Sequence, residues 1–124
     1  MSDKYDITDA ELEIMQILWK EKKCDLNTIM EILNTDNEKN KNTIKTLLRR
    51  LILKGAVKSK KIGLKETVYV PAVNEEKFLN NENESFLNRL YNGSTDKLLL
   101  NFVENKKISK EELQKLMDML ESED

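Results

Sequence analysis

The chain has 124 residues, of which 39% are hydrophobic and 35% charged, and it carries 21 Lys and Arg against 23 Asp and Glu. This composition predicts one globular domain, or one domain with an appended segment, and excludes a largely disordered chain. Because no run approaches the roughly 20 apolar residues of a membrane span, and the start MSDKYDIT lacks the apolar core of a signal peptide, we expect a cytoplasmic protein.

A first helix is predicted to begin at Thr8, because Thr8 to Glu11 form a capping box in which each side chain bonds the other residue's backbone. Ile7 and Leu12 are placed to form the hydrophobic staple that accompanies such a box. The apolar spacing carries the helix to about Lys22. The side chains expected on its buried face are Leu12, Ile14, Met15, Ile17, Leu18 and Trp19.

A second, shorter helix follows, for which Asp25 is the predicted cap. Its apolar residues Leu26, Ile29, Met30 and Leu33 again have helical spacing. Cys24 is expected to be an ordinary residue between the two helices. The polar stretch Thr35 to Lys39 is predicted to be a loop, and Asn40 is predicted to cap a third helix.

The third helix has the clearest amphipathic pattern in the chain. A stripe expected to be buried contains Ile44, Leu47, Leu48, Leu51 and Ile52. At about 100° per residue, the opposite face carries Asn42, Lys45, Thr46 and Arg49, with Arg50 on its flank. Gly55 should end this helix, because glycine adopts a left-handed conformation without a Cβ penalty.

After Gly55 the sequence favours a β-hairpin. Ala56 to Lys61 and Thr67 to Val70 are predicted to pair as strands across the turn Ile62 to Glu66, and Pro71 is expected to end the second strand. Two helices, a loop, a helix and a two-stranded hairpin are the elements of a winged helix-turn-helix. The expected fold class is therefore mainly α with a small β-hairpin.

Charge is strongly segregated along the chain. Lys39 to Lys65 contains ten basic residues and no acidic one, inside a protein of net charge −2. Such a local positive field favours a phosphate-binding surface. Arg and Lys bond guanine edges and Asn42 suits adenine, whereas Thr46 suits a thymine methyl or a phosphate and wing lysines suit phosphates. The residues predicted to contact DNA are Lys41, Asn42, Thr43, Lys45, Thr46, Arg49, Arg50, Lys58, Lys60, Lys61 and Lys65. The alternative is a solvated helix face beside a lysine-rich loop.

The last fifty residues predict three more helices: one over Asn74 to Tyr91, one capped by Ser94 after a break at Asn92-Gly93, and one begun by a capping box at Ser109. So small a unit has little interior of its own, so we expect a second copy to complete its core. The predicted dimerisation residues are Phe86, Leu87, Leu90, Tyr91, Leu98, Leu99, Phe102, Val103, Leu113, Leu116, Met117 and Leu120. The alternative is that these helices fold back on the N-terminal part of the chain.

This division predicts a winged-helix DNA-binding domain over residues 1–73 and a helical dimerisation domain over residues 74–124. A two-fold dimer would place two recognition helices in successive major grooves of double-stranded DNA. The predicted operator is therefore an inverted repeat.

The sequence contains few of the residues on which enzyme active sites are commonly built. The chain has no histidine and one cysteine, which excludes His-based catalytic triads, ordinary His/Cys zinc sites and an intrachain disulfide. The paired acids Glu75-Glu76 and Glu111-Glu112 each lie where a helix should begin and suit its dipole. We expect no catalytic residue, metal or cofactor.

Two stretches carry a family resemblance. Thr43 to Leu47, with Arg50, Leu51 and Lys54-Gly55, and the later residues Phe86, Asn88, Tyr91 to Gly93 and Leu98 to Glu104 resemble the penicillinase and methicillin-resistance repressor family (BlaI/MecI type). The resemblance extends over essentially the whole chain. It implies a homodimeric repressor that binds a dyad operator and blocks transcription of β-lactam-resistance genes, often together with its own gene.

The resemblance also implies a release mechanism, in which a membrane sensor with a cytoplasmic metalloprotease responds to β-lactam and cuts the repressor between Asn101 and Phe102. Two departures are visible: Lys41-Asn42 stand where relatives often have Pro-Lys, and the cysteine-rich tail of copper-responsive relatives is absent. Two alternatives stay open. One is a repressor of unrelated genes controlled by a small ligand or a protein partner, and the other is a winged helix that binds proteins rather than DNA.

Overall fold

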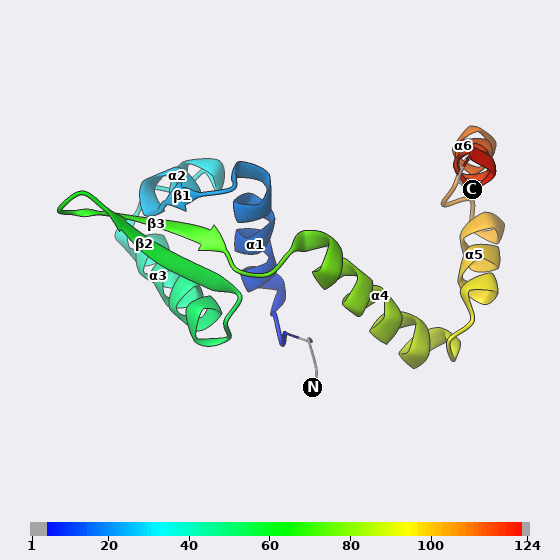
Figure 1. Cartoon of the computed structure of the whole chain (residues 1–124), viewed down its shortest axis with the longest axis horizontal. Helices are drawn as coiled ribbons and strands as arrows, with labels where there is room; N and C mark the ends of the chain where they lie inside the picture. The colour runs from blue at the N-terminus through cyan, green and yellow to red at the C-terminus, as the bar shows by residue number, and fades with distance from the viewer. Residues whose placement is uncertain (1–4, 123–124) are drawn as a thin grey trace. The chain divides into compact units, whose positions relative to one another are not determined.

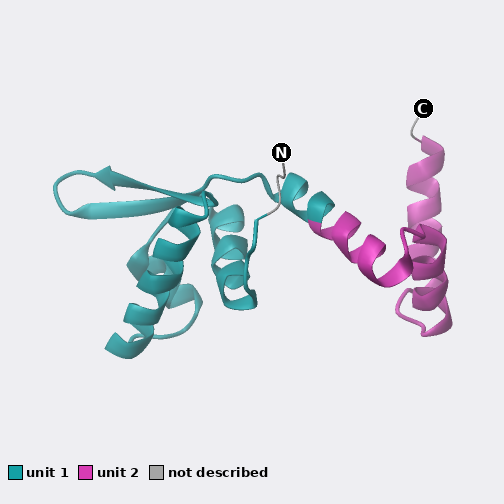
Figure 2. Ribbon diagram, turned by 90° about the horizontal axis from the view of Figure 1, so that it is seen from below, with its two compact units in different colours: residues 1–81 teal, residues 82–124 magenta. Residues whose placement is uncertain are grey.

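The computed structural model describes residues 5–122. The chain divides into two compact units, Met1–Asn81 and Glu82–Asp124 (Figure 2). The expected mainly helical architecture with a small sheet is confirmed. The elements in chain order are α1 (Asp9–Glu21), β1 (Cys24–Asp25), α2 (Leu26–Ile32), α3 (Glu38–Leu53), β2 (Val57–Ile62), β3 (Glu66–Pro71), α4 (Glu75–Tyr91), α5 (Thr95–Glu104) and α6 (Lys110–Ser122).

The caps of the first two helices are those that the sequence predicts. Thr8 and Glu11 form the complete capping box of α1, and the Asp25 carboxylate accepts the Thr28 backbone N–H at 2.8 Å at the start of α2. The cap predicted for α3 is wrong. Asn37 is the cap, because its side chain accepts the backbone N–H of Asn40 at 2.8 Å, and the helix therefore begins at Glu38 within the expected loop.

The sheet has three strands rather than two, in the order β1-β3-β2. The expected hairpin is present, and its strands pair antiparallel from Val57 opposite Pro71 to Ile62 opposite Glu66. The third strand is β1, in which Cys24 pairs with Tyr69. Cys24 is thus a buried strand residue and not simply a residue between helices. The end of the hairpin projects beyond α1, α2 and α3 (Figure 1).

One core holds the N-terminal unit together, with side chains from α1, α2 and α3 packed under the sheet. The buried stripe predicted for α3 is confirmed at Ile44, Leu48 and Leu51, whereas Ile52 is 37% exposed and was wrongly expected inside. At the end of α3, Gly55 has φ +82°, as its predicted role as helix terminator requires. The buried apolar residues are Ile14, Met15, Ile17, Leu18, Cys24, Ile29, Met30, Ile44, Leu48, Leu51, Ala56, Val57, Val73 and Phe78.

The first turns of α4 belong to this same core. Trp19 donates its indole N–H to the Val73 carbonyl at 2.9 Å, and its ring lies 5.4 Å from that of Phe78. Because Phe78 is buried, the compact unit continues to Asn81. The predicted division into a DNA-binding domain (residues 1–73) and a dimerisation domain (residues 74–124) concerns function rather than compactness. It stays a prediction.

The second unit contains the rest of α4 together with α5 and α6. Ser94 caps α5 by accepting the Lys97 backbone N–H at 3.2 Å, and Ser109 forms the predicted capping box with Glu112, with both bonds at 3.0 Å. The paired acids Glu75-Glu76 and Glu111-Glu112 lie in the first turns of α4 and α6, as predicted. No residue from 82 to 122 is buried.

Candidate nucleic-acid interface

The predicted recognition face of α3 is open to solvent. Lys41 is half-buried, and the other predicted residues of this helix are exposed. The hydroxyls of Thr43 and Thr46 donate to the carbonyls of Lys39 and Asn42 at 3.1 and 3.0 Å. These bonds restrict the two threonine side chains while leaving their hydroxyl oxygens able to accept further hydrogen bonds. The exposed residues are Asn42, Thr43, Lys45, Thr46, Arg49 and Arg50.

The wing lysines do not share one face. Lys58 and Lys60 lie opposite Val70 and Val68, whereas Lys61 lies opposite Thr67. Because successive residues of a strand point to opposite faces, Lys58 and Lys60 lie on one face of the hairpin and Lys61 on the other. Lys65 follows in the turn, and all four lysines are exposed.

A groove of about 370 Å³ lies between α3 and the wing, and three of the predicted residues line it. Lys41 and Lys45 reach it from α3, and Lys65 reaches it from the turn. Two acids, Asp25 and Glu66, also line the groove. Asp25 caps α2, and the hydrogen bonds from Thr28 lower the pKa of its carboxyl group below the ordinary value.

Three further polar residues of this groove were missed by the sequence prediction: Asn27, Thr67 and Tyr69. Thr67 and Tyr69 are two residues apart in β3 and therefore lie on the same face of the strand. This is the face toward the core, where Tyr69 packs against the buried cluster. The period-two alternation of the predicted strand could have shown that Thr67 and Tyr69 share one face. Asn27 reaches the groove from the first turn of α2, and no pattern in the sequence points to this position.

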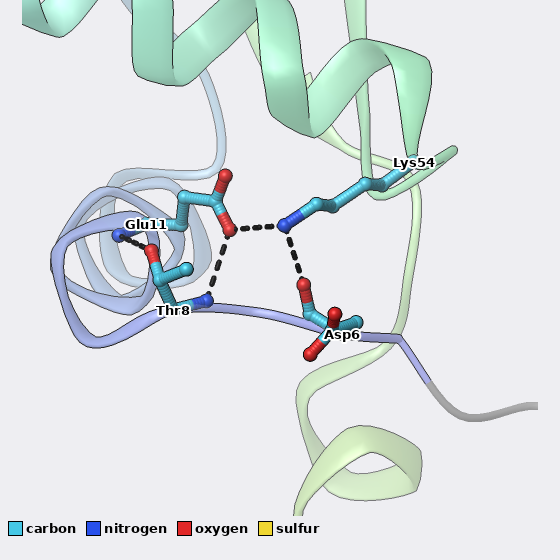
Figure 3. A network of polar contacts seen from close by, with 4 residues as sticks. All are labelled: Asp6, Thr8, Glu11 and Lys54. Atoms are coloured by element: carbon cyan, nitrogen blue, oxygen red, sulfur yellow. Dashed lines mark hydrogen bonds and ion pairs between the residues drawn. The ribbon is translucent and has the colours of Figure 1, made fainter.

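One of the ten basic residues is used within the fold. Lys54, at the end of α3, bonds Glu11 of α1 at 2.6 Å and also donates to the Asp6 carbonyl (Figure 3). Glu11 is fully buried, and its Oε1 also accepts the Thr8 backbone N–H at 2.9 Å. Lys54 therefore links the end of α3 to the start of α1.

The Glu11 carboxylate is held in its charged form. Burial acts to raise its pKa, but the hydrogen bonds from Lys54 and Thr8, with the Lys54 charge, outweigh burial and lower the pKa below its ordinary value. Its second oxygen, Oε2, is buried and has no hydrogen-bond partner among residues 5–122. The network is thus a buried ion pair with one incompletely satisfied acceptor.

The predicted dimerisation residues are accessible in this single chain. Leu99, Leu116 and Met117 are 46 to 47% exposed, Leu120 is 74% exposed, and none of the twelve is buried. Leu100 and Met119 are also exposed apolar residues, and the prediction did not include them. The Asn101 and Phe102 pair lies in α5, and both of its residues are exposed.

The described part of the chain contains neither a candidate metal site nor a helix that could span a membrane. No group of three or more His, Cys, Asp or Glu side chains among residues 5–122 is placed to hold a metal ion. Within the same range, every helix is too short or too polar to cross a bilayer.

The sequence is similar to those of known repressor proteins. Residues 7–122 match the family model described as penicillinase repressor. The chain is 40% identical over 115 residues to the penicillinase repressor of Bacillus licheniformis, which covers 93% of this chain and 89% of that protein. It is 34% identical to the methicillin resistance regulatory protein MecI of Staphylococcus aureus (strain N315), over 94% of each chain.

The fold has a counterpart among solved structures. The apo form of wild-type MarR from E. coli superposes with a TM-score of 0.54, at 15% identity, and the match covers 94% of this chain and 77% of that one. At this identity the match concerns the fold alone. From its sequence match over residues 7–122, this chain belongs to the penicillinase repressor family.

Proposed function

We propose that the chain is a homodimeric, sequence-specific DNA-binding repressor of β-lactam-resistance genes. The observation that carries the proposal is the exposed cationic face of α3 beside a groove that Lys41, Lys45 and Lys65 line. A helix fits the major groove, and its first turns contact base edges. Lysines of the wing are placed to contact phosphates, which orient the protein without selecting sequence.

Pairing of two chains is supported by the second unit. A stable helical unit needs a buried interior, yet no residue from 82 to 122 is buried in the single chain. The exposed leucines and methionines of α5 and α6 are the surface that a second copy would cover. A two-fold pair would then present two α3 helices to an inverted repeat in duplex DNA.

Family membership supports the proposed target genes and the proposed release step. The relatives are named penicillinase repressor and methicillin resistance regulatory protein, so we propose β-lactam-resistance genes as targets. Release is proposed to follow cleavage between Asn101 and Phe102 by a membrane sensor metalloprotease. Cutting α5 would remove part of the dimer surface and with it the linked binding of two half-sites.

The family is one of repressors rather than enzymes, which agrees with the expectation drawn from the absence of histidine. Action on chromosomal or plasmid DNA requires the protein to be in the cytoplasm, and we propose that location. Neither a cofactor nor a metal enters the proposed mechanism.

The direct test is selection of binding sites from random duplexes, followed by footprinting of the selected site. We expect a symmetric protected region, with the logarithm of affinity falling against the logarithm of salt at about −0.9 per phosphate contact. Arg49 variants keep phosphate contacts through the wing and serve as a specificity control. Equally tight binding to random duplex would contradict sequence-specific repression.

A further inference from the structure

The first turn of α3 carries an acid on the face that is proposed to contact DNA. Glu38 is the first residue of the helix, and its side chain is exposed. Asn42, Lys45 and Arg49 follow it along the helix, and at about 100° per residue all four lie in one row. Because the sequence pattern placed residues 35 to 39 in a loop, Glu38 was absent from the predicted DNA contacts.

Hydrogen bonds hold this first turn in place. The Asn37 side chain accepts the backbone N–H of Asn40 at 2.8 Å, and the Asn40 side-chain amide donates to the Thr35 hydroxyl at 2.6 Å. The start of α3 is thereby fixed to the segment before it. Glu38 forms no ion pair among residues 5–122. Its carboxylate is therefore positioned at the end of the recognition face and able to accept hydrogen bonds from a bound molecule.

An acid at a helix start stabilises the helix dipole, and this explains Glu75 as well as Glu38. On a helix that enters DNA, however, a carboxylate also repels the phosphates and every acceptor on the base edges. It is tolerated best where it meets a hydrogen-bond donor. In the major groove, cytosine presents its N4 amino group, whereas guanine presents two acceptors and thymine one, and adenine has an acceptor beside its amino group.

Resting on the proposed DNA binding, we propose that Glu38 selects a cytosine in each half-site by accepting a hydrogen bond from its N4 amino group. Asn42 lies one turn further along α3, which corresponds to about 6 Å of helix rise. The selected cytosine should therefore lie within about two base pairs of the pair that Asn42 contacts, because base pairs are spaced at about 3.4 Å.

The test uses the full chain, with binding sites selected from random duplexes. Selection with Asn42→Ala identifies the pair that Asn42 contacts. For the wild type, inverting the nearby C·G pair should weaken binding about fivefold or more, since inversion keeps the base composition but moves the amino donor away from Glu38. Glu38→Ala should reduce this penalty to about twofold or less. Glu38→Gln should shift the selected base toward adenine, whose N6 and N7 a glutamine bonds together.

Glu75→Gln is the matched control. Glu75 is also an exposed glutamate at the first position of a helix, and it follows Asn74, whose side chain accepts the Lys77 backbone N–H at 3.1 Å. This variant loses the same favourable interaction with a helix dipole but lies outside α3, so it should select the wild-type sequence.

Two results would overturn the role of Glu38 and leave the proposed repressor function intact. One is the same selected sequence for the wild type and Glu38→Ala. The other is loss of the cytosine preference in Glu75→Gln as well, which would assign the preference to helix stability. Failure of the wild type to select any duplex would instead overturn the DNA binding itself, and the role of Glu38 with it.

Discussion

A buried carboxylate, Glu11, links the start of α1 to the end of α3. It completes the cap of α1 and receives Lys54 from the end of α3 (Figure 3). Its pKa in the folded chain is lowered, so the unfolded chain binds more protons at mildly acidic pH. The stabilising contribution is therefore fully present above the ordinary carboxyl pKa of 4.5 and is lost as pH falls through the lower folded value.

We expect Lys54→Met to lower the free energy of unfolding by about 1 to 3 kcal/mol at pH 7, because it leaves a buried carboxylate without its cation. Glu11→Gln should cost less at pH 4 than at pH 7, because below pH 4.5 Glu11 of the unfolded wild-type chain takes up a proton before Glu11 of the folded chain does, which reduces the stability that the charge contributes. Urea unfolding at the two pH values measures both effects. Lys20→Met, an exposed lysine of α1, is the control. A Glu11→Gln deficit of equal size at both pH values would show that the charge contributes nothing.

Arg49 and Lys61 are expected to contribute to DNA binding in different ways. Arg49 lies on the exposed face of α3, where an arginine bonds guanine edges, whereas Lys61 lies in the wing, where phosphate contacts are expected. Arg49→Ala should cost about 1 to 3 kcal/mol on the operator and little on random duplex. Lys61→Ala should weaken both and reduce the salt slope by about one. Competition binding measures the ratio, and equal losses on both duplexes from both variants would contradict the division.

Residue patterns in the sequence predict local features well where one side chain determines them. The caps at Thr8, Asp25, Ser94 and Ser109 were each predicted, because a cap depends only on residues three positions apart. The cap of α3 was misplaced, because both Asn37 and Asn40 suit the position. Asn37 caps the helix, and Asn40 instead donates its side-chain amide to Thr35 at 2.6 Å.

Among the secondary-structure elements, the sheet was predicted only in part from the sequence pattern. The hairpin was predicted from a change of period after Gly55, and its observed strands differ from the predicted bounds by one residue at each of the four ends. β1 was not predicted, because a two-residue strand has no period and exists only through its pairing with β3. Asn27 lines the groove from α2, directly after β1, and the sequence pattern did not place it there.

Two hydrogen bonds at the end of α5 involve the peptide bond that is proposed to be cleaved. The carbonyl of Asn101 belongs to the peptide bond joining it to Phe102. It accepts the backbone N–H of Asn105 at 3.0 Å and the side-chain amide of the same residue at 2.9 Å. A protease needs this segment to leave the helix, so each bond opposes cutting.

Asn105→Ala removes the side-chain bond and keeps the backbone bond. A hydrogen bond worth about 0.5 to 1.5 kcal/mol should make local opening, and hence cutting at this site, roughly 2- to 10-fold faster. Limited digestion with a metalloprotease that cuts before large apolar residues, with fragments identified by mass, measures the rate. Asn83→Ala, in α4, should cut at the wild-type rate. An unchanged rate in Asn105→Ala would show that this bond does not limit access.

At the scale of the whole molecule, the proposed function requires both units. The N-terminal unit has a core and a cationic face, while the second unit has apolar helix faces and no buried residue of its own. In the proposed dimer, binding of the second half-site becomes an intramolecular event, which would raise the overall affinity by orders of magnitude without new contacts.

Sedimentation of the protein with its selected duplex, at micromolar concentration, tests this account most directly because it counts chains on DNA. The account predicts a free protein of two-subunit mass and a complex with two chains on each inverted repeat. A protein that sediments as one subunit, and either binds the duplex as a single chain or leaves it free, would contradict it.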